Sequence, residues 1–210
     1  AAFGYAKVQK AWERTLGRHN HTIDLTSPLG KEVILILESD LSVTHPVFGL
    51  NILQAKREGS QLIVADSRET KLTRHSSLWL RIKDGTSIAF LNGIMKVIID
   101  KGLYPKETIS TIPGFSSLQS MLGNYTTDKV AKITGIPEEA ITAAAEALGR
   151  ARSRMLSLSV SASENTKGLN TVIAAANLIN LLREDSSALQ IPAEYSNSYG
   201  LYHMGVRPDD

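Results

Sequence analysis

Three short polar segments, each directly after an apolar run, are the parts of this sequence best placed to carry chemistry. They are Glu38-Ser39-Asp40, Asp66-Ser67-Arg68 and Gly85-Thr86-Ser87. Continuous apolar runs of this kind are typical of buried parallel strands, and ligands bind beyond the carboxyl ends of such strands. Carboxylates and hydroxyls at these ends can hydrogen-bond a polar ligand. We therefore expect any binding site to lie at this edge of a sheet.

Asp66 follows the second apolar run and resembles an acid placed to hydrogen-bond a ribose hydroxyl in a nucleotide-binding sheet. The alternative is a solvated loop acid that pairs with Arg68 across a tight turn, and the sequence leaves both open. The phosphate-binding pattern G-x-G-x-x-G is missing, because the first run is followed by Glu38-Ser39-Asp40-Leu41. Glu38 and Asp40 would place negative charge where phosphate should bind, which argues against ordinary NAD binding.

The remaining reactive residue types predict no catalytic residue and no metal ligand. The chain has no cysteine, which excludes disulfides, thiolate catalysis and Cys-ligated zinc or iron–sulfur clusters. His19 and His21 flank Asn20 in a loop, where a metal site is the less favoured interpretation. His45 precedes Pro46 at a helix start, where a loop or capping role is expected, and no G-x-S-x-G motif activates a serine.

The elements that must position these residues alternate between strand and helix. We expect strands at Val33–Leu37, Leu62–Ala65, Leu78–Ile82, Met155–Val160 and Ala188–Ile191. Amphipathic or apolar runs predict helices over residues 3–16, 46–58, 87–100, 115–122, 127–134, 137–150 and 168–182, with another beginning at Pro105. Thr44 is expected to cap the helix at Pro46, and Thr86 or Ser87 the helix that ends at Asp100.

This alternation predicts an α/β fold with a doubly wound, mostly parallel, Rossmann-like sheet. The expected strand order is about 3-2-1-4-5, with helices on both faces and a helical insertion after the third strand. Residues 1–192 are expected to form this domain, and residues 193–210 a tail leading toward a next domain of a longer protein.

Composition excludes several kinds of partner. Of the 210 residues, 42% are hydrophobic and 21% charged, as in ordinary globular proteins. The net charge of +2 is too small to indicate a nucleic-acid partner. No apolar stretch approaches the roughly 20 residues that span a bilayer, and no secretion signal is visible. We therefore expect a cytoplasmic location without direct membrane insertion.

Taken together, the segments resemble the molybdopterin oxidoreductase family, which includes formate dehydrogenase alpha subunits and the large iron–sulfur subunit of bacterial NADH–quinone oxidoreductase. The resemblance covers nearly the whole chain in order. It rests on V-I-L-I-L at Val33, H-P-V at His45, L-I-V-A-D-S-R-E-T at Leu62, Gly85-Thr86, Asn177 to Leu182, and the closing N-S-Y-G and M-G-V-R-P segments.

The resemblance implies that this is the third, Rossmann-like domain, one of two that cradle a bis(molybdopterin guanine dinucleotide). Asp66 and Arg68 match a turn that holds a guanosine, and Gly85-Thr86 matches a loop whose guanine-binding Asp is Ser87 here. The family's G-S-N is replaced by Glu38-Ser39-Asp40, and its G-x-G by Ser159-Val160-Ser161. The site residues implied are Ser39, Asp40, His45, Asp66, Arg68, Gly85, Thr86, Ser87 and Ser161.

These departures favour the branch related to NADH–quinone oxidoreductase, with a weakened or vestigial dinucleotide cleft. Formate chemistry lacks its cation, because Ala193-Glu194-Tyr195-Ser196-Asn197 stands where formate dehydrogenases carry a catalytic Arg. The alternatives are the cofactor-binding domain of an active molybdenum or tungsten enzyme, and a subunit-docking scaffold. We expect no cofactor in the fragment alone and iron–sulfur clusters in a missing N-terminal part. The expected partners are other subunits of an electron-transfer complex, which would hold the protein peripherally at the inner membrane.

Overall fold

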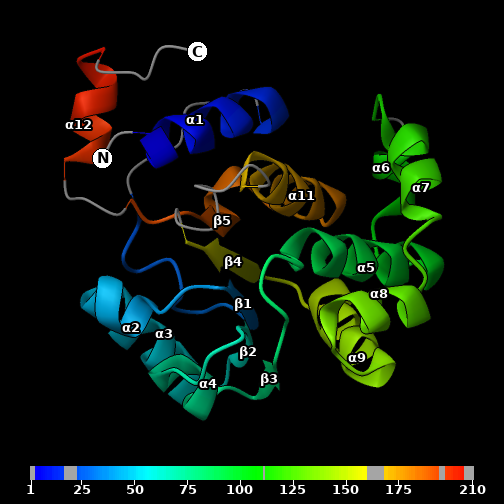
Figure 1. The fold of residues 1–210 in the computed structure, drawn as a ribbon, viewed down its shortest axis with the longest axis horizontal. Coiled ribbons are helices and arrows are strands. Elements are labelled where there is room, and N and C mark those ends of the chain that lie inside the picture. The colour runs from blue at the N-terminus through cyan, green and yellow to red at the C-terminus, as the bar shows by residue number, and fades with distance from the viewer. Residues whose placement is uncertain (1–2, 17–22, 111, 160–167, 194–196, 206–210) are drawn as a thin grey trace.

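The fold is built on a five-stranded parallel sheet with the order β3-β2-β1-β4-β5, which confirms the predicted order. The computed structural model describes residues 3–16, 23–110, 112–159, 168–193 and 197–205. The strands are β1 (Val33–Leu37), β2 (Gln61–Ala65), β3 (Leu78–Leu80), β4 (Arg154–Leu158) and β5 (Leu189–Gln190). Figure 1 shows helices on both faces of this sheet, also as predicted.

Strand β1 lies at the centre of the sheet and contributes to two hydrophobic cores. In its middle, Leu35 pairs with Ile63 of β2 and Leu156 of β4. All five β1 side chains are buried, because successive side chains point to opposite faces and both faces are covered. Ile34 and Ile36 face one core, and Val33, Leu35 and Leu37 face the other.

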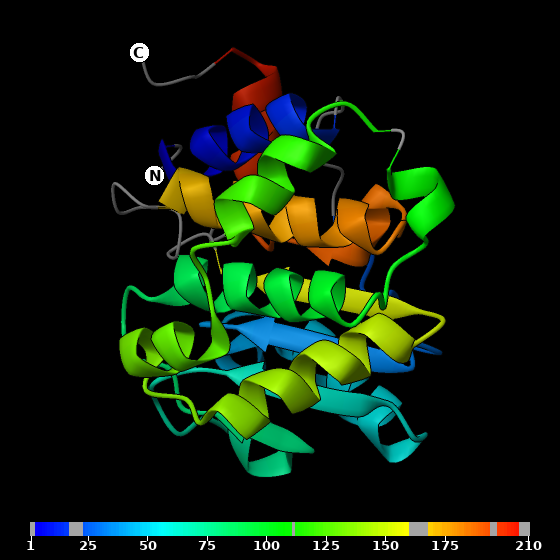
Figure 2. The ribbon, with the colours of Figure 1, turned by 90° about the vertical axis from the view of Figure 1, so that its right-hand side faces the viewer.

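Three consecutive helices cover the smaller core: α2 (Leu41–Thr44), α3 (Pro46–Arg57) and α4 (Lys71–His75). The larger core lies between the sheet and α1 (Phe3–Leu16), α5 (Ser87–Asp100), α9 (Glu138–Arg150) and α11 (Gly168–Leu181). The predicted helical insertion after β3 comprises α6 (Lys106–Ile109), α7 (Phe115–Leu122), α8 (Thr127–Thr134) and α9, and it stacks on α5 (Figure 2).

Several boundaries differ from the predictions for local reasons. The strand expected over residues 78–82 ends at Leu80, because the Lys83 N–H donates to the Thr134 carbonyl at the end of α8. Thr44 belongs to α2 and does not cap α3, whose N-cap position is His45. A short 3-10 turn, η1 (Ser186–Ala188), leads into β5, and α12 (Ser198–His203) packs against α1 in the predicted tail. The domain boundary at residue 192 stays a prediction.

A largely buried ion pair connects the start of β4 to the ends of α9 and α11. Arg154, the first residue of β4, donates to the carbonyl oxygens of Leu148 and Gly149 at the end of α9. Its Nη1 also lies 2.8 Å from Oε1 of Glu184, which follows α11. The guanidinium therefore satisfies carbonyls that the helix end leaves unpaired, and its charge is balanced inside the fold.

Candidate functional site

The carboxyl ends of β1, β2 and β3 bring the three predicted polar segments to one edge of the sheet. The Glu38 N–H donates to the Ala65 carbonyl at 2.8 Å, and the Asp66 N–H to the Leu80 carbonyl at 3.2 Å. The backbone ladder thus continues one residue past each strand and places the acids Glu38 and Asp66 side by side. We call residues 38–40, 66–68 and 85–87 together the strand-end site.

Glu38 turns its side chain toward the first turn of α5. Its carboxylate Oε2 accepts a hydrogen bond of 2.5 Å from the Ser87 hydroxyl, and the carboxylate also accepts the Gly85 N–H. The backbone of Glu38 has φ +45°, a left-handed conformation that costs a non-glycine residue about 1 kcal/mol. Glu38 thus occupies hydrogen-bond donors at the N-terminal end of α5, where helices commonly bind anions.

The environment of Glu38 raises its pKa above the ordinary value. The largest cause is burial, which penalises the charged form, and the nearby carboxylates of Asp66 and Asp84 add to it. The hydrogen bonds from Ser87 and Gly85 act in the opposite direction, because they stabilise the carboxylate. Glu38 is therefore an acid held in a place that disfavours negative charge.

Asp66 is almost completely buried and uses only one of its two carboxylate oxygens. Its side chain is 2% exposed, and Oδ1 accepts the Arg68 N–H at 2.8 Å and lies 3.5 Å from Arg68 Nε. Oδ2 is buried as well and has no hydrogen-bond partner in the described part of the chain. Asp66 thus pairs with Arg68 across a tight turn, as one interpretation of the sequence expected, but it is buried and not solvated. Its role as an acceptor for a ribose hydroxyl stays a prediction.

The cations around the strand-end site point outward. Arg68 is 69% exposed, and Lys83 and Arg81 are exposed too. The Arg81 guanidinium lies 5.8 Å from the centre of the Trp79 ring, a weak cation–π contact. The Trp79 indole N–H donates to the Asp66 carbonyl at 3.0 Å, so the ring packs at the edge of the site.

The other residues predicted around β1 are placed as follows. Ser39 is buried, and Asp40 Oδ1 accepts a hydrogen bond of 2.5 Å from the Ser42 hydroxyl in the first turn of α2. His45 lies between α2 and α3, with Nε2 3.0 Å from the Ala193 carbonyl beyond β5. That contact places a proton on Nε2, because a carbonyl oxygen only accepts. His45 therefore connects the segment after β1 to the segment after β5.

The predicted loop before α5 is joined to the site through Ser87 and Gly85. Thr86 occupies the N-cap position of α5 but accepts no side-chain cap bond, and its hydroxyl donates to the Lys83 carbonyl at 2.6 Å. Ser161 lies outside the described residues. The sequence singled out Glu38 as an obstacle to phosphate, but it gave no sign that Ser87, 49 residues away, is its partner. The only signal in the sequence was Glu38 itself, which stands where the family that the chain resembles has a glycine.

Within the described ranges, no group of three or more His, Asp or Glu side chains has a geometry that could hold a metal ion. None of the described helices is long and apolar enough to cross a membrane. The strand-end site itself offers hydrogen bonding and charge, with the half-buried Glu38 and the buried Asp66 as acceptors inside and exposed cations at the rim.

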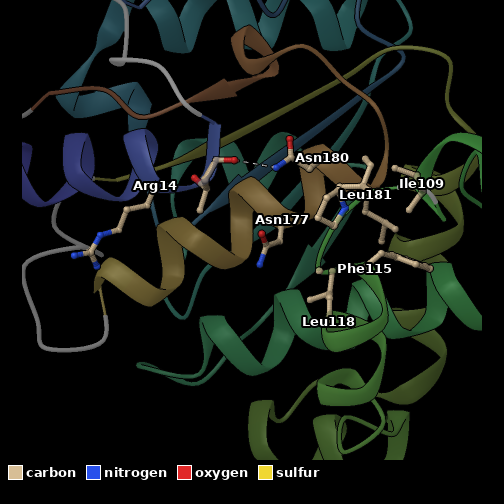
Figure 3. Close-up of a pocket in the computed structure, with 11 residues that line it drawn as sticks. Arg14, Ile109, Phe115, Leu118, Asn177, Asn180 and Leu181 are labelled. Carbon is tan, nitrogen blue, oxygen red and sulfur yellow. Dashed lines mark hydrogen bonds between the residues drawn. The ribbon is translucent and has the colours of Figure 1, made fainter.

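A cavity that the sequence did not indicate lies elsewhere, between α1, α7 and the last turns of α11 (Figure 3). It measures about 330 Å³ and is lined by apolar side chains such as Ile109, Phe115 and Leu181, with Asn180 donating to the Thr15 carbonyl. α11 begins after the carboxyl end of β4 and runs back, so this cavity lies toward the opposite edge of the sheet. Arg14 is the one charged residue among its described lining residues, and Figure 3 shows it directed away from the apolar group.

Comparison with known proteins places this geometry in context. A family model described as "Molybdopterin oxidoreductase" matches residues 20–205. The F420-dependent formate dehydrogenase subunit alpha of Methanocaldococcus jannaschii is 30% identical over 85% of this chain and 27% of its own length. The NADPH-Fe(3+) oxidoreductase subunit alpha of Geobacter sulfurreducens is 24% identical over 100% of this chain and 25% of its own.

Among solved structures, acetylene hydratase from Pelobacter acetylenicus superposes with a TM-score of 0.75 at 24% identity. The match covers 87% of this chain and 25% of that one, and it supports the fold. The chain thus spans about a quarter of the length of each of these relatives.

Proposed function

The chain belongs to the molybdopterin oxidoreductase family, and we propose that it is a domain of an electron-transfer subunit whose guanine-dinucleotide site is weakened. The subunit we expect is most like the large iron–sulfur subunit of NADH–quinone oxidoreductase. Its partners are then the other domains of the same chain and other subunits of the complex. We place that complex in the cytoplasm, held at the inner membrane through those subunits.

One observation carries this proposal: the Glu38 carboxylate is bonded to the Ser87 hydroxyl and the Gly85 N–H. A dinucleotide needs such donors for its own oxygens, and here an internal anion has taken them. Displacing this anion, or burying a phosphate beside it, costs free energy because like charges repel and an unpaired buried charge is expensive. The site therefore disfavours the phosphates of such a cofactor.

The residues present fit a molybdopterin guanine dinucleotide only in part. The free Oδ2 of Asp66 suits a ribose hydroxyl, but the segment after β1 lacks the glycines that let a backbone approach a pyrophosphate. In proteins that hold such a cofactor, the metal and pterin carry the redox chemistry and the protein supplies binding and orientation. We assign no such step to this chain.

A second candidate is the nucleotide-binding domain of an active formate dehydrogenase-like enzyme. It is favoured by the unfilled acceptor on Asp66, and by the 30% identity to a formate dehydrogenase alpha subunit. Molybdenum and tungsten analysis of the full-length protein distinguishes the two. Our proposal predicts neither metal at stoichiometric level, whereas about one metal per chain would establish the second candidate.

Calorimetric titration with GDP tests the weakened site directly. We expect a Kd in the millimolar range or weaker for the wild-type chain. Glu38→Gly should bind GDP at least about tenfold more tightly, because it removes a like charge and frees Ser87 and Gly85. Glu139→Gln, on the exposed first turn of α9, changes net charge equally and serves as the control. Micromolar GDP binding by the wild type would refute the proposal.

A further inference from the structure

We infer that the cavity between α1, α7 and α11 is a binding site for a small amphipathic carboxylate. In this arrangement the apolar chain of the ligand lies against Ile109, Phe115 and Leu118, and its carboxylate faces Asn177 and Arg14. The cavity lies away from the strand-end site, so the inference goes beyond the proposed function and does not depend on it.

The arrangement of four helices leaves this cavity open. α1 packs on α11 and α7 packs on α5, so a space remains between α1 and α7 beside the last turns of α11. Gly114 precedes α7 with φ +89°, and a Cβ added there would meet nothing within 4 Å. The volume of about 330 Å³ lies in the range of ligand pockets. Since a water takes up about 30 Å³ in the liquid, the cavity has room for roughly ten non-hydrogen atoms.

One end of the cavity is apolar. Four apolar side chains gather there in Figure 3, namely Ile109, Phe115, Leu118 and Leu181. Phe115 and Leu118 are only half-buried, and Ile112 on the rim is 39% exposed. A hydrocarbon chain placed against them removes apolar surface from water, and each buried methylene strengthens binding about fourfold. This end therefore favours an alkyl chain.

The other end of the cavity carries hydrogen-bond donors and a positive charge. Asn177 lies one helical turn before Leu181 on α11, is half-buried, and has no hydrogen-bond partner for its amide among the described residues. Asn180 is held by its hydrogen bond to the Thr15 carbonyl at 3.3 Å. Arg14 lies beyond Asn177 from the apolar group, is exposed, and forms no ion pair with a described residue (Figure 3).

The ligand class follows from the two ends together. A carboxylate only accepts hydrogen bonds, and an amide N–H₂ and a guanidinium supply the donors it needs. The single cation suits a single negative charge, and the apolar end excludes sugars and nucleotides, whose polar groups would be left unpaired there. Octanoate has an alkyl chain, one carboxylate and about the size that the volume allows. It is therefore the probe we choose.

The test is a calorimetric titration of the full-length protein with octanoate, butanoate and octanol at pH 7. We expect octanoate to bind with a Kd of about 1 mM or tighter. Butanoate, which lacks half of the chain, should bind at least about thirtyfold more weakly. Octanol has the same chain without the charge, so it reports on the apolar end alone.

Three variants separate the two ends of the cavity. Arg14→Gln should raise the octanoate Kd about threefold and leave the octanol Kd within a factor of about two, because an exposed charge contributes modestly. Leu118→Trp, which fills the apolar end, should raise both Kd values at least about tenfold. Arg57→Gln is the matched control, because Arg57 is an exposed arginine at the end of α3 on the opposite face of the sheet.

Each of four results would overturn the inference. They are no octanoate binding up to about 10 mM, butanoate binding as tightly as octanoate, equal effects of Arg14→Gln and Arg57→Gln, and wild-type binding by Leu118→Trp. The fold of each variant is checked by its circular dichroism spectrum. If Leu118→Trp does not fold, Ile112→Trp fills the cavity from its exposed rim and should raise both Kd values in the same way.

Discussion

At the scale of single residues, Glu38 combines two features that each cost free energy, a left-handed backbone and a partly buried carboxylate. Its left-handed backbone costs about 1 kcal/mol and its partly buried carboxylate has a raised pKa. The hydrogen bonds from Ser87 and Gly85 are what hold the side chain in this position. Residues kept in strained conformations concentrate at functional sites, and at Glu38 the strain belongs to the same residue that occupies the donors at the start of α5.

The pKa of Glu38 makes a prediction about stability and pH. The folded-state pKa is raised above the ordinary value of about 4.5, so ionising Glu38 costs the folded state more than the unfolded state. Below about pH 4.5 Glu38 is protonated in both states and does not lower the free energy of unfolding. As the pH rises through the folded-state pKa, the free energy of unfolding falls, because Glu38 ionises more easily in the unfolded chain. Glu38→Gln should gain stability relative to wild type at pH 7, and this gain should vanish below about pH 4.5.

The left-handed backbone adds a part that does not depend on pH. Glu38→Gly should be about 1 kcal/mol more stable than Glu38→Gln at every pH, because glycine adopts a positive φ without the steric cost. Urea unfolding of the three proteins between pH 4 and pH 8 measures both effects. A stability difference between wild type and Glu38→Gln that grows as the pH falls would contradict the assignment of the raised pKa.

At the scale of elements, the sequence predicted the strands and long helices well and the short helices poorly. β1 and β2 are apolar runs that are buried on both faces, and such runs can be recognised without tertiary information. α2, α4 and α12 have four to six residues, too few to show a helical period. α4 is set by a capping box between Thr70 and Thr73, which uses threonine at the position where glutamate or glutamine is usual.

The position of the candidate site in the fold could be predicted from the sequence, but the contacts between its residues could not. The parallel sheet placed Asp66, Gly85 and Glu38 at one edge, and the apolar runs before them indicated that edge. The contact between Glu38 and Ser87 depends on how the loop after β3 turns into α5, and nothing in either local sequence encodes it. Ser161 was predicted from resemblance alone, and its role stays a prediction.

The close approach of α2 and α3 after β1 gives a prediction at this scale. A Cβ added at Gly49 would lie 2.8 Å from the Leu41 carbonyl oxygen and 2.9 Å from the Ser42 Cα, which are backbone atoms that cannot rotate away. Gly49→Ala should therefore destabilise the chain by about 1–3 kcal/mol, although alanine favours helix formation by about 1 kcal/mol. Thermal unfolding measures the change.

The neighbouring position provides the control for that experiment. Leu50 lies next along α3 and is 57% exposed, so Leu50→Ala should change the free energy of unfolding by less than about 0.5 kcal/mol. A Gly49→Ala variant as stable as the wild type would show that α2 moves away at little cost. In that case the segment that follows Glu38 is less firmly fixed than the structure implies.

At the scale of the whole molecule, two hydrophobic cores share one sheet. Alternate residues of β1 point into the larger and the smaller core, so the packing of both cores depends on the same strand. Met95 lies in the larger core and Met155 in the smaller one, both fully buried. The chain therefore carries one methyl probe on each side of the sheet.

We expect the two cores to unfold together. In a urea titration followed by methionine-methyl NMR, the signals of Met95 and Met155 should disappear with the same midpoint, because β1 couples the two sides. The exposed methyls of Met121 and Met204 should change little and serve as references. Separate midpoints for Met95 and Met155 would show that the helices on one face can detach from the sheet on their own.

The indole of Trp79 gives the strand-end site its own optical signal. The chain has two tryptophans, and Trp12 is buried in the larger core while Trp79 bonds to the backbone of Asp66. Replacing Trp12 by phenylalanine leaves Trp79 as the single tryptophan, directly beside Asp66. Ultraviolet fluorescence can then follow events at Asp66 in real time, without a label attached to the protein or to the ligand.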